Sequence, residues 1–257
     1  MRRFGWLLLL GVFGFAAGLR GVGSDELRRF ERTEQHMGAP IRVVTYAPDR
    51  ATASDAMSAA FARIAQLDSL FSDYLPDSEA SLLPARAHDE WASVSEELFD
   101  LLRLSDEWSA KTDGAFDVTL GPLTRLWRWS ARRSELPEAA RLDEARAAVG
   151  HRHVQLDEGG RRVRFDLPGM ALDFGAIAKG FAADAALATL DEHGLSSSLV
   201  DAGGDLALGA PPPDAPGWRI ELPEGDVVQL ARTGVATSGD EHRFFEVDGV
   251  RYSHVID

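Results

Sequence analysis

The chain has 257 residues, 45% of them hydrophobic and 26% charged, which is enough apolar material for one large domain. This balance excludes a disordered chain, a collagen-like repeat and a coiled coil. The 41 acidic residues outnumber the 27 basic ones and give a net charge of −14. Such a surface repels phosphate backbones, so no nucleic-acid partner is expected. Cysteine is absent, which excludes disulfides, thiolate metal ligands and cysteine nucleophiles.

The first twenty residues have the pattern of an export signal. Two arginines precede an apolar stretch over residues 4–19 that is marginal in length for a full bilayer span. We therefore predict a signal peptide or short N-terminal anchor over residues 1–20, a charged linker over residues 21–34 and a folded domain over residues 35–257. The protein is expected to be exported to the periplasm or to the periplasmic face of the inner membrane, and to meet the membrane only through this anchor.

The pattern of apolar residues along the domain predicts an α+β fold. A β-branched run predicts a strand over residues 41–46, and apolar residues at helical spacing predict a helix over residues 53–71. Further helices are expected over residues 96–110, 136–149 and 177–193, with a hairpin made by residues 154–156 and 163–165. Short strands are expected near residues 198–200, 206–208, 219–222, 227–230, 244–247 and 251–256. Early helices followed by mostly antiparallel strands indicate α+β rather than an alternating parallel sheet.

Several familiar signatures are missing from the sequence. It has no GxGxxG, GxxxxGK[ST], HExxH or GxSxG motif, so a Rossmann dehydrogenase, a P-loop NTPase, a zincin and an α/β-hydrolase are not expected. What remains is a set of small-residue turns beside charged side chains. In the first, residues 112–119, glycine allows close approach of the backbone to a ligand, and Phe116 could cover a flat ring. Taken alone, this segment is better explained as a helix C-cap with a core phenylalanine.

A second turn, residues 172–181, opens a helix. The free N–H groups and the positive end of the helix dipole make such a start a natural phosphate site. Lys179 in the first helical turn is unfavourably placed for the dipole, so we interpret it as facing an anionic ligand. Asp173 just before the turn either binds a ligand or caps the helix.

Two later turns carry acidic or hydroxyl side chains. Residues 201–205 place a pair of glycines between two strands, which an acidic hairpin turn explains equally well. Residues 235–240 combine hydroxyls with a glycine, which suits contact with phosphate. His254, on a strand expected to face them, is a candidate general base. A lone histidine is more often structural, so none of these motifs is specific by itself.

Taken in chain order, these segments resemble the ApbE-type flavin transferases, the FAD:protein FMN transferase family. The matching residues are 36–38, 71–74, 77–79, 114–123, 127, 172–184, 201–206, 235–240 and 251–257. Several ordered segments spread over residues 37–257 are far more specific than any motif alone.

The resemblance implies a T-fold-like α+β domain that transfers FMN from FAD to a threonine hydroxyl of a partner flavoprotein. It implies that the reaction requires Mg²⁺ and releases AMP, and that the partner is a protein such as a subunit of a redox-driven ion pump. It implies FAD contacts from Met37, Tyr74, Ala115, Phe116, Asp117, Asp173, Lys179 and Ile256. It makes Ala176 a metal ligand through its carbonyl group, and His254 the base toward the acceptor hydroxyl. This chemistry is reasonable because a diphosphate is a poor electrophile until a hard cation neutralises it, and a threonine hydroxyl needs a base.

The resemblance is incomplete in three respects. The family continues beyond the segment that ends at residue 257 with further metal ligands, so we expect this chain to be a C-terminally incomplete fragment. Pro84 and Asp201 stand where the family usually has asparagine. These departures leave two alternatives open: an FAD pyrophosphatase that gives FMN and AMP, and a non-catalytic flavin-binding protein.

Overall fold

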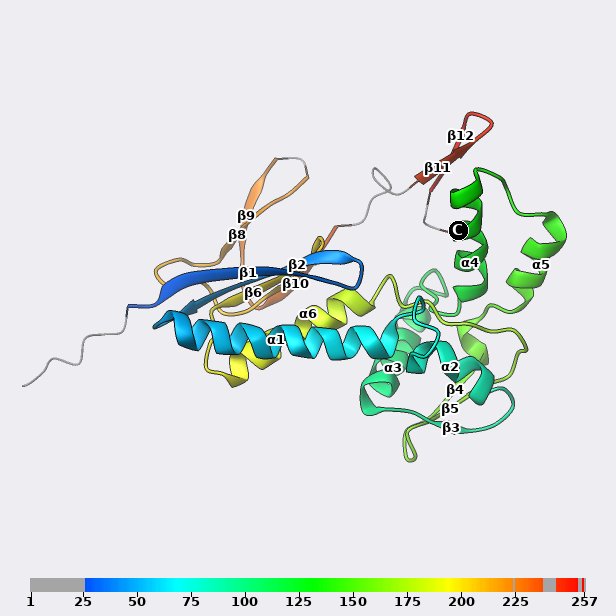
Figure 1. The fold of residues 1–257 in the computed structure, drawn as a ribbon, viewed down its shortest axis with the longest axis horizontal. Coiled ribbons are helices and arrows are strands. Elements are labelled where there is room, and N and C mark those ends of the chain that lie inside the picture. The colour runs from blue at the N-terminus through cyan, green and yellow to red at the C-terminus, as the bar shows by residue number, and fades with distance from the viewer. Residues whose placement is uncertain (1–25, 224, 238–243, 254–255, 257) are drawn as a thin grey trace, which may run out of the picture.

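The centre of the molecule is a five-stranded antiparallel sheet with strand order β1-β2-β6-β7-β10 (Figure 1). The computed structural model describes residues 26–223, 225–237, 244–253 and 256. The strands of the sheet are β1 (Arg28–His36), β2 (Ala39–Ala47), β6 (Ser198–Ala202), β7 (Asp205–Leu208) and β10 (Thr233–Ala236). Because β2 pairs with β6, the sheet joins the early and the late parts of the chain.

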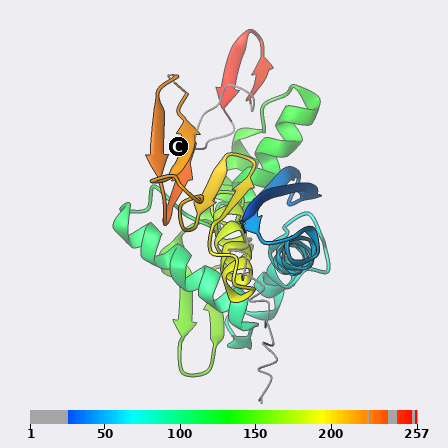
Figure 2. The ribbon, with the colours of Figure 1, turned by 90° about the vertical axis from the view of Figure 1, so that its left-hand side faces the viewer.

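Two helices, α1 (Arg50–Phe71) and α6 (Ala178–Glu192), pack against each other and against one face of this sheet. Figure 2, which views α1 almost along its axis, shows α6 beside it. The strands turn every second residue toward the helices: Ile41 and Val43 of β2 and Val200 of β6 lie in the main hydrophobic cluster. This two-helix, one-sheet unit supports the site described below.

The opposite face of the sheet is partly covered by the hairpin of β8 (Trp218–Glu221) and β9 (Val227–Leu230). Here Val44, which alternates with Val43, packs with Trp218 in a second apolar cluster. Both faces of β2 are therefore buried, which explains its nearly continuous apolar run.

Helix α1 forms because its apolar side chains recur every three or four residues. Met57, Phe61, Ile64 and Leu67 are all buried on one side. The helix begins after Asp49, whose carboxylate accepts a hydrogen bond from the Thr52 N–H at 2.8 Å.

The remaining elements lie beyond one end of the α1 helix (Figure 1). They are α2 (Glu79–Arg86), β3 (Ala92–Ser93), α3 (Glu96–Lys111), α4 (Gly121–Arg133), α5 (Ala139–Ala147), a 3-10 turn (His151–His153), β4 (Val154–Asp157), β5 (Arg162–Phe165), β11 (Phe244–Val247) and β12 (Val250–Ser253). Leu83, Leu98 and Phe165 connect α2, α3 and β5 to the main cluster. The β11–β12 hairpin rests on α4, with the rings of Phe245 and Trp127 5.5 Å apart.

The predicted linker of residues 21–34 overlaps a strand, since β1 begins at Arg28. This part of the prediction is wrong. The inward-facing positions of β1 carry charged residues, and the pattern therefore reads as polar. Arg32 and Glu34 form an ion pair there, and the Arg32 guanidinium lies 5.0 Å from the centre of the Phe61 ring. Charges that pair with each other and stack on a ring can lie on a half-buried face.

The predicted fold class, α+β with mostly antiparallel strands, is confirmed. The helices expected at residues 53–71, 96–110 and 177–193 are present, whereas that expected at residues 136–149 is limited to α5. Helices α2 and α4 were not expected from the sequence. A glycine and a proline open α4, and proline is well tolerated at the first positions of a helix although it breaks a helix interior.

Across the described residues, the longest and most apolar helices still fall short of what a bilayer crossing requires. The predicted N-terminal anchor lies outside the described residues and stays a prediction.

Candidate functional site

Several turns meet at one end of the central sheet. In the β1–β2 turn, the Met37 N–H donates a hydrogen bond to the Asp68 carboxylate near the end of α1 at 2.8 Å. Met37 has a left-handed backbone, with φ of 50°, and its half-buried side chain packs on the main cluster. In the β6–β7 turn, a Cβ on Gly203 would lie 3.0 Å from the Cβ of Ala39 at the start of β2. Segments far apart in the sequence thus become neighbours here.

The turn that precedes α6 is held at the same end. The Asp173 N–H donates to the Val118 carbonyl at 2.8 Å, which joins this turn to the segment of residues 112–119. Asp173 Oδ1 in turn accepts a hydrogen bond from the Gly175 N–H at 2.8 Å. Asp173 therefore holds the turn by both its main chain and its side chain. The aromatic rings of Phe71 and Phe174, 6.0 Å apart, fix the turn against the end of α1.

Lys179 lies in the first turn of α6 and points toward the β6–β7 turn. Its ammonium group is 3.6 Å from the Asp205 carboxylate, and its side chain is 19% exposed. Since a positive charge at a helix N-terminus is unfavourable, Asp205 offsets part of that cost. The lysine and the helix start together present positive potential at this end of the sheet, as an anionic ligand would need.

A second cation at the site, Arg128 of α4, was not singled out by the sequence. Its Nη2 atom donates to the carboxylates of Asp73 and Asp173, the latter at 2.9 Å. Burial acts to lower the pKa of Arg128, but the hydrogen bond and the charge of Asp73, together with the charge of Asp173, outweigh it, and the pKa of Arg128 is raised. The guanidinium also lies 4.5 Å from the centre of the Tyr74 ring. No sequence signal distinguishes this arginine from the many others.

Tyr74 follows α1 and is 76% exposed, with Arg128 over its ring. An exposed aromatic ring is available for stacking against a planar ligand. Ala176 is also exposed, in the turn before α6.

The segment of residues 112–119 divides its side chains between surface and core. Ala115 is exposed, and Phe116 is half-buried against the main cluster. Both carboxylate oxygens of Asp117 accept hydrogen bonds from the protein. Oδ1 accepts from the Thr119 N–H at 2.7 Å, and Oδ2 accepts from the His151 N–H at 2.9 Å. Its carboxylate therefore stabilises the loop between α3 and α4.

The last predicted site residues lie beside α4. Ile256 packs on an apolar cluster that includes Leu123 and Leu126 of that helix. The Trp127 indole donates to the Ser253 carbonyl at 2.7 Å, which ties β12 to α4. His254 lies outside the described residues.

The described residues contain no group of three or more histidine or carboxylate side chains that could hold a metal ion. They do provide isolated oxygen donors at this end of the sheet. The exposed Ala176 contributes a main-chain carbonyl, and Asp173 lies three residues before it. Oxygen donors of this kind suit Mg²⁺, which commonly takes one or two protein ligands and completes its shell with substrate phosphates and water.

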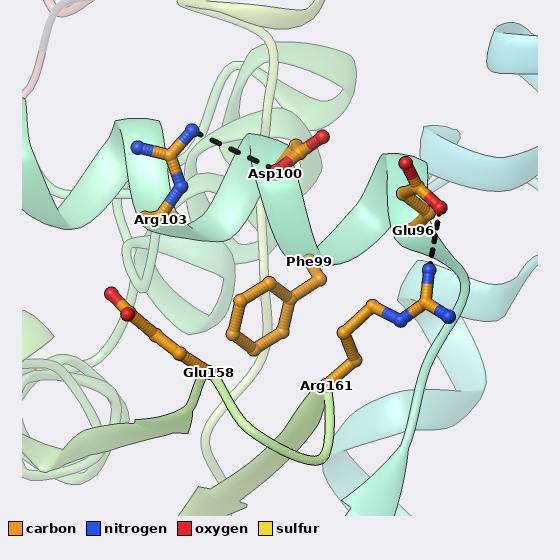
Figure 3. Close-up of a pocket in the computed structure, with 6 residues that line it drawn as sticks. All are labelled: Glu96, Phe99, Asp100, Arg103, Glu158 and Arg161. Carbon is orange, nitrogen blue, oxygen red and sulfur yellow. Dashed lines mark hydrogen bonds and ion pairs between the residues drawn. The ribbon is translucent and has the colours of Figure 1, made fainter.

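Two cavities lie away from these residues. One, of about 490 Å³, separates α3 from the turn between β4 and β5 (Figure 3). Its lining residues are Glu96, Phe99, Asp100, Arg103, Glu158 and Arg161. Glu96 and Arg161 already pair with each other at 2.5 Å. The other cavity, of about 400 Å³, lies between α6 and strands β7 and β10. Neither is lined by a residue that the resemblance assigns to FAD, so neither is part of the candidate site at the end of the sheet.

The chain is similar to proteins of known family. The ApbE family model matches residues 37–257. A protein of Treponema pallidum named FAD:protein FMN transferase is 34% identical over 93% of this chain and 73% of its own length. A protein of the same name from Vibrio cholerae is 33% identical over 75% of this chain and 60% of its own length. The chain thus spans between 60% and 73% of these two relatives.

Solved structures give the same assignment. The ApbE protein of Thermotoga maritima superposes with a TM-score of 0.79 at 30% identity, covering 90% of this chain and 76% of that one. The apo form of the flavinyl transferase ApbE of Pseudomonas stutzeri gives a TM-score of 0.79 at 33% identity, with 90% and 75% covered. The matching segments of residues 36–38, 71–74, 114–123, 172–184 and 201–206 are the ones that meet at the end of the sheet. The chain therefore belongs to the ApbE family.

Proposed function

We propose that this chain is a FAD:protein FMN transferase, which moves FMN from FAD to a threonine hydroxyl of a partner flavoprotein and releases AMP. Its curated relatives carry the name of that activity, and the enzyme class follows from them. One structural observation carries the proposal: the turn before α6 is joined to the segment of residues 112–119 through Asp173 and Val118, and to Tyr74 through Arg128. Segments that resemble the family's FAD-binding motifs thus form one surface.

Each part of this surface has a role that its chemistry supports. Lys179 and the start of α6 would bind the diphosphate of FAD, because both present positive charge. Tyr74, which is exposed, offers a flat face for stacking of a planar ring. Asp173, whose Oδ1 accepts from the Gly175 N–H and whose Oδ2 accepts from Arg128, would act on FAD through the turn and the arginine that it holds. Met37, Ala115 and Phe116 would complete the proposed FAD surface through van der Waals contacts.

For Asp117, which the resemblance makes an FAD contact, we propose an indirect role. Because both of its oxygens accept hydrogen bonds from the protein, it would act on FAD through the loop that it holds. We propose that Ile256 supports the neighbouring α4 surface, on which it packs.

Magnesium is part of the proposal, with the Ala176 carbonyl as one ligand. When bound, Mg²⁺ would neutralise negative charge on the diphosphate, which a protein of net charge −14 does not do over its general surface. His254 is proposed to take the proton of the acceptor hydroxyl, because the pKa of histidine lies close to neutral pH.

The site of action is proposed to be the periplasm or the periplasmic face of the inner membrane. The support is the arginine pair and apolar stretch of residues 1–20, which have the composition of an export signal or short anchor. A partner such as a subunit of a redox-driven ion pump would carry the acceptor threonine in that compartment. Cell fractionation with an antibody to the chain checks this location, and a cytoplasmic pool would contradict it.

The proposed activity is tested by incubating the chain with FAD, Mg²⁺ and a threonine-bearing acceptor domain, while AMP and the acceptor mass are followed. We expect AMP together with an acceptor heavier by one FMN, and no product after chelation of the metal. An acceptor in which the threonine is replaced by valine is the matched control.

The hydrolase alternative is one outcome of this experiment. AMP with an unmodified acceptor would show an FAD pyrophosphatase, and FAD binding without AMP would show a flavin-binding protein. One reason for these alternatives was that Asp201 replaces the usual asparagine of the family. Asp201 has a structural role in the β6–β7 turn, which accounts for an acidic residue there. Its carboxylate accepts from the Gly204 N–H at 3.1 Å and lies 3.2 Å from Arg42.

A further inference from the structure

Arg128 connects three segments that the sequence keeps far apart. It is separated from Asp73 by 55 positions and from Asp173 by 45, yet a single guanidinium nitrogen donates to both carboxylates. The two carboxylates must therefore lie close to each other. Their side chains are only 11% and 18% exposed, so water screens them incompletely.

The arginine is itself held by its own helix. Its Nη2 atom lies 3.2 Å from the Thr124 hydroxyl, and its Nε atom donates to the Thr124 carbonyl at 3.4 Å. A planar guanidinium can serve several acceptors and an aromatic face at once, which an ammonium group cannot do with the same geometry. Arg128 does this here, since the Tyr74 ring lies under it at 4.5 Å.

We propose that Arg128 is a positioning residue for FAD: it holds Asp173 and the Asp73–Tyr74 segment in the arrangement that the flavin substrate needs, and it neutralises two carboxylates beside the diphosphate. This inference rests on the proposed function. It adds a residue of α4 to the FAD site, and it assigns Asp73 to the site as a partner of the arginine.

The physical argument is one of charge. Without Arg128, Asp73 and Asp173 would be two uncompensated carboxylates at short range, and like charges that are partly buried repel strongly. The same charges would repel the diphosphate of FAD. Loss of the arginine should therefore weaken FAD binding, and removal of one carboxylate should restore part of it.

The test measures FAD affinity by flavin fluorescence on Arg128→Met, Arg128→Lys and the double variant Asp73→Asn with Arg128→Met. We expect Arg128→Met to weaken FAD binding by about tenfold, which corresponds to ~1.4 kcal/mol. Arg128→Lys, which keeps the charge, should lose less. The double variant should bind FAD about threefold more tightly than Arg128→Met alone. Arg125→Met, at an exposed position of the same helix, is the matched control and should leave binding within twofold.

Two results would overturn the inference: an Arg128→Met variant that binds FAD as the wild type does, or a double variant no better than Arg128→Met. A purely structural role would lower the melting temperature and kcat together, whereas a positioning role raises KM for FAD more than it lowers kcat. If Arg128→Met does not fold, the double variant Asp73→Asn with Arg128→Met carries the test, and an FAD affinity in it equal to that of the wild type contradicts the proposal.

Failure of this inference can be told apart from failure of the proposed function. A wild-type chain that binds FAD but does not modify the acceptor contradicts the transferase, while the affinities of the variants still decide the role of Arg128. A wild-type chain that modifies the acceptor, with Arg128→Met unaffected, contradicts the role of Arg128 alone.

Discussion

The position of Lys179 is unfavourable for the helix dipole of α6 but favourable for binding an anion. Its ammonium group lies at the positive end of α6, where a cation costs about 0.3–1 kcal/mol. Asp205 at 3.6 Å offsets part of this cost but is not in close hydrogen-bonded contact. The charge is therefore still available to an anion that approaches the start of the helix.

We predict that Lys179→Met weakens FAD binding by about tenfold, because a hydrogen bond to a charged group contributes roughly 1.5–3 kcal/mol. Equilibrium titration of FAD with fluorescence detection measures this change. The chain offers a matched control in Lys111, the other lysine, which is exposed at the end of α3. Lys111→Met should bind FAD as the wild type does, and equal losses in the two variants would contradict a local role for Lys179.

At the scale of elements, the connection from α1 to α2 decides where Asp73 and Tyr74 lie. This connection is short and is held by Ser78, the buried N-cap residue of α2. The Ser78 hydroxyl donates to the Ser72 carbonyl at 2.6 Å and accepts from the Ser81 N–H at 3.0 Å. One side chain thus joins the end of one helix to the start of the next.

We expect Ser78→Ala to lower the free energy of unfolding by about 1–2 kcal/mol, since it removes a helix cap and the shorter of the two hydroxyl hydrogen bonds to the Ser72 carbonyl. It should also weaken FAD binding, because the segment carrying Tyr74 loses its anchor. Urea unfolding and FAD titration measure the two effects. Ser54→Ala, at an exposed position of α1, should change neither. A destabilised Ser78→Ala variant with unchanged FAD affinity would show that the α1–α2 connection does not contribute to FAD binding.

At the scale of the whole molecule, one hydrophobic cluster joins the two-helix sheet unit to the elements beyond α1. It includes Ile41 of β2, Leu67 of α1, Leu98 of α3 and Phe165 of β5. The candidate FAD surface draws on both parts, through Lys179 of α6 and Arg128 of α4. A shared core of this kind favours cooperative unfolding, and a ligand bound across it should stabilise all of it.

FAD at one hundred times its dissociation constant should therefore add about 2.7 kcal/mol to the free energy of unfolding and raise the melting temperature by roughly 5–10 °C. Thermal unfolding followed by circular dichroism and by tryptophan fluorescence checks this prediction, and both signals should shift together. Riboflavin, which lacks the diphosphate, is the control and should have a smaller effect. A shift in only one of the two signals would mean that the two parts unfold separately.

The sequence by itself determined the fold class and most of the elements, and it predicted the segments that meet at the candidate site. Helix α1 could be predicted because the spacing of Phe61, Ile64 and Leu67 reports which face a local segment buries. The ordered turns around residues 112–119, 172–181 and 201–205 could be found because glycines mark where the backbone must turn tightly.

Only the tertiary structure decided which charged residues face each other. Arg32 and Glu34 made β1 look like a linker, because the sequence does not show that their charges are paired. The sequence also does not show that the oxygens of Asp117 accept hydrogen bonds from Thr119 and His151. Arg128 was indistinguishable among many arginines until α4 placed it beside Asp73 and Asp173. The physical reason is range: hydrophobic periodicity is a local property of the chain, whereas a charge acquires its role from partners that only folding brings near.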